Sequence, residues 1–258
     1  MKLKVEDVEF GYNGTLVLEG ISIDLDRSEI IGIVGPNGAG KSTLIRCIDR
    51  ILTPRGGTIL LDGADMGKMT RMEIAKEMGY VPQTTTRVFP ATVFDTVLMG
   101  RRPHLGWKSS VDDVDIVLGV LELLGIMEFA MRDFNEISGG QQQKVLIARA
   151  LAQEADILLL DEPTSNLDIR HQLEVMEIMQ GIVRAKSISA IVAIHDLNLA
   201  SRYTDRLLMM NGGRIFAAGD PESVLTVENI RRAYGVEALV KSDGERPYII
   251  PVRPVRPV

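Results

Sequence analysis

The stretch GPNGAGKS at residues 35–42 decides the fold. It fits the pattern G-x-x-x-x-G-K-[S/T] and stands between an apolar run at 30–34 and a segment with helical character at 43–51. A glycine-rich loop between a strand and a helix turns backbone N–H groups inward and adds the positive end of the helix. Both features favour a dense anion, so the sequence predicts a loop that holds a triphosphate.

This loop supplies most of the expected contacts to ATP. Lys41 is expected to reach the β- and γ-phosphates, and the Ser42 hydroxyl is expected to ligate Mg²⁺. An ordinary glycine-rich turn with a surface lysine is the alternative, but the pattern lies where strand–loop–helix geometry requires it. The expected nucleotide-binding residues of the loop are Gly35, Pro36, Asn37, Gly38, Ala39, Gly40, Lys41, Ser42 and Thr43.

Composition limits the class of protein. The chain has 258 residues, of which 45% are hydrophobic and 25% are charged, and this balance favours a folded core and excludes disorder. Its formal net charge of −6 provides no general positive field, so we expect no nucleic-acid partner. The single cysteine, Cys47, cannot form an internal disulfide and is expected to be a small buried hydrophobic residue.

The apolar residues give no sign of a membrane span. No apolar run approaches the roughly 18 to 20 residues that cross a bilayer, and the start MKLKVEDVEF lacks the apolar block of a secretion signal. We therefore expect the chain to remain in the cytoplasm.

Hydrophobic periodicity divides the chain into β-like and helical parts. Short β-like runs are expected at 5–10, 16–25, 30–34 and 58–61, and a helical block follows at about 84–155. The order strand at 157–160, helix at 169–183 and strand at 189–194 is typical of a parallel α/β sheet.

The last residues have a different pattern. Pro251, Pro254 and Pro257 stand three residues apart, which would place them on one edge of a polyproline II helix. We expect an extended tail at 241–258, either frayed or serving as a docking strip for a partner.

Two acidic residues follow the apolar run at 157–160. Asp161 would lie at the carboxyl edge of the sheet beside the phosphate loop, where it suits the Mg²⁺ shell. Glu162 would orient or deprotonate the attacking water as a general base. The alternative is that both carboxylates only solvate a loop, although a buried strand rarely ends in an acidic pair without a cation.

A second helix start able to bind an anion occurs in ISGGQQQKVLIARALAQ, residues 137–153, where Ser138 is a natural N-cap. From about residue 3 to 235 the sequence resembles the ATP-binding cassette (ABC) ATPase family, and its signature SGGQ is present as Ser138, Gly139, Gly140 and Gln141. The more usual leucine before the serine is replaced by Ile137.

The resemblance implies a fold and an assembly. The fold is the P-loop NTPase fold of ABC type, with a mainly parallel sheet core, an N-terminal antiparallel β part and an inserted helical subdomain at about 84–155, all within an ABC ATPase domain at 1–240. It also implies a head-to-tail dimer that holds each ATP between the P-loop of one copy and the signature of the other. ATP hydrolysis would then let the two copies separate.

Four further residues match the family one by one. Tyr12 occupies the position of an aromatic that stacks on adenine, Gln83 that of a glutamine touching Mg²⁺ and water, and His195 that of a histidine sensing the γ-phosphate. Asp168, in SNLD, resembles a loop residue that crosses to the opposite subunit. Ordinary structural roles remain open for all four: a strand-end tyrosine, a loop glutamine, a helix-capping aspartate and a structural histidine.

Finer resemblance, in the segments 88–104 and 164–179, is to ATPase subunits of importers for iron-siderophore, haem and cobalamin. It implies separate membrane permease subunits, an indirect link to a substrate-binding protein, and a peripheral position on the cytoplasmic side of the cell membrane. Expected permease contacts are Val88, Phe89, Phe94, Leu98 and Met99, with Arg101 or Arg102 pairing with acids or lipid phosphates. The alternatives are a non-transport ABC ATPase acting on DNA or in translation, an importer ATPase for another metal, and a P-loop kinase.

Overall fold

The computed structural model describes residues 2–83, 90–104, 110–165, 167–242, 244 and 246–255. Within them, a four-stranded antiparallel sheet has the order β2-β1-β4-β5, and a six-stranded sheet has the order β10-β9-β3-β8-β7-β6. All neighbouring pairs of the larger sheet are parallel except β10 and β9. The strands are β1 (Leu3–Tyr12), β2 (Thr15–Leu25), β3 (Ile30–Val34), β4 (Gly56–Leu61), β5 (Ala64–Asp65), β6 (Met78–Val81), β7 (Ile157–Asp161), β8 (Ser189–Ala193), β9 (Arg206–Asn211) and β10 (Arg214–Gly219). The predicted mainly parallel core and antiparallel N-terminal part are confirmed.

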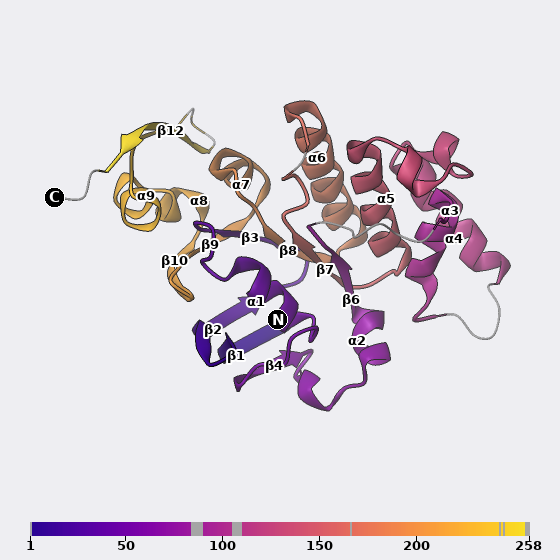
Figure 1. Ribbon diagram of the computed structural model, residues 1–258, viewed down its shortest axis with the longest axis horizontal. Helices are drawn as coiled ribbons and strands as arrows, with labels where there is room; N and C mark the ends of the chain where they lie inside the picture. The colour runs from indigo at the N-terminus through magenta and orange to yellow at the C-terminus, as the bar shows by residue number, and fades with distance from the viewer. Residues whose placement is uncertain are drawn as a thin grey trace.

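The six-stranded sheet is covered on both faces. Along β7, Ile157 and Leu159 belong to one hydrophobic core, and Leu158 and Leu160 belong to the other, as the two-residue period of a strand requires. The first core includes α1 (Lys41–Ile48) and the antiparallel sheet, so α1 lies between the two sheets (Figure 1). The second core includes α5 (Gly139–Ala152), α6 (Ile169–Lys186) and α7 (Leu197–Tyr203). This arrangement brings the start of α1 to the carboxyl edge of the parallel strands.

The helices between β6 and β7 begin at residues that cap them. Thr92, Ser110 and Ser138 each accept a hydrogen bond from the backbone N–H three residues later, and the side chain at that later position accepts from the backbone N–H of the cap. These boxes start α3 (Val93–Leu98), α4 (Val111–Leu123) and α5. The helices lie inside the block predicted at 84–155 and form the purple-to-pink part of Figure 1. The other helices before β7 are η1 (Met66–Lys68), α2 (Arg71–Glu77), η2 (Met99–Arg101), η3 (Met127–Phe129) and η4 (Phe134–Glu136).

The side chain of Arg101 is buried and forms hydrogen bonds within its own chain. Its Nε donates to Oδ1 of Asp113 at 2.9 Å, and its Nη1 donates to the carbonyl oxygen of Ala152 and to Oε2 of Glu154, both at 2.7 Å. The prediction that Arg101 pairs with acids of a partner or with lipid phosphates is therefore wrong, because its guanidinium already donates hydrogen bonds to Asp113, Ala152 and Glu154. Arg102 is exposed. Val88 and Phe89, which were expected to contact the permease, lie outside the described residues.

Replacing Arg101 by methionine should destabilise the fold, because it leaves the side chain of Asp113, which is 8% exposed, without its cation. We expect the melting temperature to fall by roughly 5 °C or more in thermal denaturation. The matched control is Arg253→Met, since Arg253 pairs with Glu237 while its own side chain is 70% exposed, and surface pairs contribute little. Equal melting temperatures for the two variants would contradict the structural role of Arg101.

The C-terminal residues form a hairpin, which corrects the predicted tail at 241–258. β11 (Val236–Ser242) pairs antiparallel with β12 (Pro247–Pro254). The hairpin is fixed to α7, because the Ser201 hydroxyl donates to the carbonyl oxygen of Pro247 at 2.6 Å and the Asn198 side chain exchanges two hydrogen bonds with the backbone of Ile249. It follows α8 (Pro221–Val224) and α9 (Val227–Tyr234), beside which it lies in Figure 1. Pro257 lies outside the described residues.

Candidate active site

The phosphate loop joins β3 to α1 with a backbone that needs glycine. Gly40, the N-cap of α1, has a φ of 101°, in the left-handed region. A Cβ at this position would lie 2.8 Å from Cδ2 of Leu18, so the antiparallel sheet also presses against the loop here. The predicted strand–loop–helix geometry is therefore present, with the helix N-terminus directed at the loop.

Lys41 is buried inside the loop that it follows. Its Nζ donates to the carbonyl oxygens of Gly35 at 2.9 Å and Pro36 at 3.2 Å, and it lies 4.0 Å from Oε1 of Glu162. Burial lowers the pKa of the lysine, and the carboxylates of Glu162 and Asp161 act in the opposite direction. The ammonium is thus held inside the loop by charge-assisted hydrogen bonds to two backbone carbonyl oxygens.

Asp161 ends β7 as a fully buried carboxylate whose two oxygens have different partners. Oδ1 accepts a hydrogen bond from the Ser42 hydroxyl at 2.6 Å. Oδ2 accepts from Nη2 of Arg46 and from the Tyr80 hydroxyl, each at 3.4 Å. Burial raises the pKa of the Tyr80 hydroxyl, which favours its protonated, donating form.

These oxygens fit Mg²⁺. Ser42 and Asp161 present adjacent hard oxygen donors, and Mg²⁺ is usually held by one or two carboxylates together with substrate phosphates. In the part of the chain that the structure describes, no group of three or more His, Cys, Asp or Glu side chains could form a protein-only metal cage. The site therefore suits a metal that arrives with the nucleotide.

Glu162 contacts the other two predicted catalytic residues, Gln83 and His195. It is 6% exposed, and its Oε2 contacts both Nε2 of Gln83 and, at 2.5 Å, Nε2 of His195. Its φ of 53° lies in the left-handed region, which a residue with a Cβ rarely adopts. The carboxylate lies beside the loop, with Oε1 4.0 Å from Nζ of Lys41.

A cavity of about 370 Å³ joins these groups. Its lining includes nine of the residues predicted to bind nucleotide or to act in catalysis, together with Val17. The nine are Asn37, Gly38, Gly40, Lys41, Ser42, Thr43, Gln83, Glu162 and His195. Tyr12 is not part of this lining; it is 44% exposed at the end of β1, edge-on to Phe10.

The signature segment lies apart from this cavity, since none of its four residues belongs to the lining. Ser138 caps α5 and is exposed together with Gly139. A Cβ on Gly140 would lie 3.1 Å from the ring of His171, whose Nδ1 is 2.7 Å from Oδ1 of Asp168. Asp168 also caps α6 by accepting from the His171 N–H, so the helix-capping account of Asp168 holds in the single chain.

The sequence reasoning missed Arg46 and Tyr80. Arg46 stands four residues after Ser42 on α1, a spacing that places both on one helix face, so it could have been found from the sequence. Tyr80 lies on β6 opposite Leu159 of β7, and Asp161 is two residues further along the same face of that strand. That contact depends on which strands are neighbours, which no local pattern shows.

Residues 18–165 match the sequence family described as ABC transporter. An uncharacterized ABC transporter ATP-binding protein of Methanocaldococcus jannaschii is 48% identical, and the match covers 98% of each chain. The cobalamin import ATP-binding protein BtuD of Halobacterium salinarum is 39% identical over 94% of this chain and 61% of its own length. The ferric enterobactin transport ATP-binding protein FepC of Escherichia coli is 35% identical over 97% and 94%.

Solved structures agree with these sequence matches. An inward-facing metal-chelate type ABC transporter matches with a TM-score of 0.85 at 29% identity, covering 97% of both chains. A dimeric structure of a bacterial ABC transporter cassette matches with a TM-score of 0.76 at 26% identity, covering 85% of this chain and 98% of that one. No helix in the described part of the present chain is long and apolar enough to cross a membrane.

Proposed function

The chain belongs to the ABC transporter family, and from that premise we propose that it is the ATP-hydrolysing subunit of an importer for an iron chelate, haem or cobalamin. The observation that carries the proposal is the cluster around Glu162. A single buried carboxylate contacts Gln83 and His195 and lies 4.0 Å from Nζ of Lys41, beside the loop that would hold the triphosphate.

The residues divide into two tasks. Lys41 and the N-terminus of α1 bind the β- and γ-phosphates, and Ser42 and Asp161 hold Mg²⁺, which when bound neutralises phosphate charge. Glu162 accepts a proton from the attacking water, and Gln83 and His195 hold its carboxylate toward that water. Tyr12 remains the proposed adenine contact.

A second copy would complete the site. Ser138 and Gly139 are exposed at the start of a 14-residue helix, where N–H groups and the helix dipole favour an anion, yet they do not line the cavity of their own chain. A head-to-tail homodimer would bring them, with Gln141 and Asp168, to the ATP held by the partner. Cassettes of this family form dimers.

We infer a separate membrane subunit, because the relatives are named as ATP-binding proteins of import or transport systems. We infer a peripheral position on the cytoplasmic side of the membrane, bound to a permease that receives cargo from a substrate-binding protein. The names of the relatives, for ferric enterobactin and cobalamin import, support large metal chelates as cargo.

Co-purification tests this proposal. A tagged chain expressed in its own host should retain a multispanning permease from detergent-solubilised membranes. The complex in liposomes should hydrolyse ATP faster in the presence of a binding protein loaded with ferric siderophore or cobalamin. Retention of DNA or ribosomes instead of a permease would contradict transport, and turnover that requires an organic phosphate acceptor would contradict hydrolysis.

A further inference from the structure

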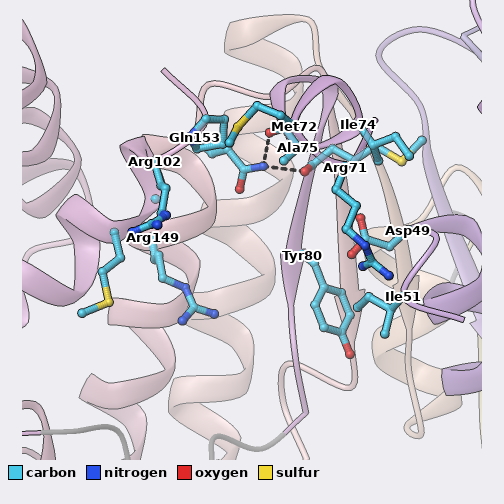
Figure 2. A pocket seen from close by; sticks show the side chains of 14 residues that line it. Asp49, Ile51, Arg71, Met72, Ile74, Ala75, Tyr80, Arg102, Arg149 and Gln153 are labelled. Carbon is cyan, nitrogen blue, oxygen red and sulfur yellow. Dashed lines mark hydrogen bonds between the residues drawn. The ribbon is translucent and has the colours of Figure 1, made fainter. Parts of the chain in front are cut away.

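A larger cavity, of about 480 Å³, lies between the α/β core and the inserted helices. α2, β6 and the residues after α1 form one wall, and η2 with the end of α5 forms the other; Figure 2 shows Tyr80 on one side and Arg102 and Arg149 on the other. The cavity is separate from the site of ATP, with which it shares no lining residue.

Tyr80 is the residue that connects this cavity to the active site. Its ring lines the cavity, beside Ile51 in Figure 2, while its hydroxyl reaches Oδ2 of Asp161 at 3.4 Å. The connection follows from the sheet, because Tyr80 lies opposite Leu159 and Asp161 is the next residue on that face of the adjacent strand.

The orientation of Asp161 depends on what holds Oδ2. Oδ1 must face Ser42 for the two oxygens to form one metal site, and a carboxylate at a strand end can rotate about its side-chain bonds. Arg46 and Tyr80 both donate to Oδ2, and Arg46 also hydrogen-bonds to the Tyr80 hydroxyl. Arg46 is 41% exposed at its side chain, so the half-buried Tyr80 is the better-fixed partner of the two.

We propose that Tyr80 is a positioning residue for the metal-binding carboxylate of Asp161. This inference rests on the proposed metal role of Asp161. In this role the Tyr80 hydroxyl acts by holding Oδ2 so that Oδ1 faces Ser42.

Tyr80→Phe tests the positioning role, because it removes the hydroxyl and keeps the ring in the cavity wall. We expect Mn²⁺, titrated in place of Mg²⁺ with the hydrolysis-resistant analogue AMP-PNP and followed by electron paramagnetic resonance, to bind about 3- to 10-fold more weakly. Binding of AMP-PNP in EDTA should remain within about twofold of wild type. Tyr248→Phe is the matched control, since that tyrosine lies on β12, far along the chain from the metal ligands, and its loss should change neither measurement.

The metal-free titration separates two failures. If wild type does not bind AMP-PNP in EDTA or with metal, the proposed function fails. If wild type binds both the analogue and Mn²⁺, but Tyr80→Phe leaves Mn²⁺ affinity unchanged or raised, the positioning role alone is overturned. Equal weakening of analogue binding with and without metal would show a general structural role and overturn it too.

Discussion

Replacing Lys41 by alanine should lower ATP affinity by about two to three orders of magnitude, since it removes charge-assisted hydrogen bonds to two phosphates. The structure strengthens this expectation, because Nζ is buried and its polar contacts among the described residues are two loop carbonyls and, at 4.0 Å, Glu162, which ATP can replace or complement. Isothermal titration with ATP measures the effect directly.

Lys68→Ala is the control for net charge. Lys68 is 85% exposed on η1, and its loss removes the same charge from a distant surface. Affinity should remain within about twofold of wild type for this variant, since exposed charges are screened by salt. If the two lysine variants bound ATP equally well, residues 35–42 would not be the nucleotide site.

Glu162→Gln should bind ATP with nearly wild-type affinity and hydrolyse it about 10²- to 10³-fold more slowly, because the amide cannot accept a proton from water. The substitution keeps the size of the side chain and an oxygen that can accept from Gln83 and His195, so the local geometry should persist. Phosphate release at saturating MgATP, alongside an equilibrium binding titration, separates the two effects.

Glu237→Gln supplies the comparison for this second experiment. Glu237 lies on β11 and pairs with Arg253, so its neutralisation should leave turnover unchanged. Undiminished turnover in Glu162→Gln would remove Glu162 from the chemistry, whereas a parallel loss of ATP binding would assign it to binding.

Local patterns predicted much of the core. The phosphate loop at 35–42 and the strand ending at Asp161 carry their own signals, since glycine spacing and a buried apolar run are properties of neighbouring residues. Cys47 is fully buried as expected, and burial raises the pKa of its thiol to about 12. Gln83 and His195 do contact the carboxylate of Glu162, although the roles of the three residues remain proposals.

Contacts between segments that are distant along the chain could not be predicted from the sequence. Arg101 looked like a surface residue until the fold brought Asp113 and Glu154 to it. The prolines of the last segment suggested polyproline II, yet a two-stranded hairpin tolerates them, because each strand has one edge without a partner strand, where a proline need not donate a ladder hydrogen bond. The signature poses a different problem, because a single chain shows only that Ser138 is exposed at a helix start, whereas the nucleotide that we propose for it would be bound by a second copy.

The central claim is that each ATP is held by Lys41 of one copy and Ser138 of another. In a Glu162→Gln background, we would mix a Lys41→Ala chain with a Ser138→Arg chain, because the mixed dimer keeps one intact site, formed by the lysine of one chain and the serine of the other. With MgATP, light scattering should show each variant alone as a monomer and the mixture as dimers containing one ATP per two chains. A mixture that remains monomeric, although the Glu162→Gln chain alone dimerises with ATP, would contradict the account.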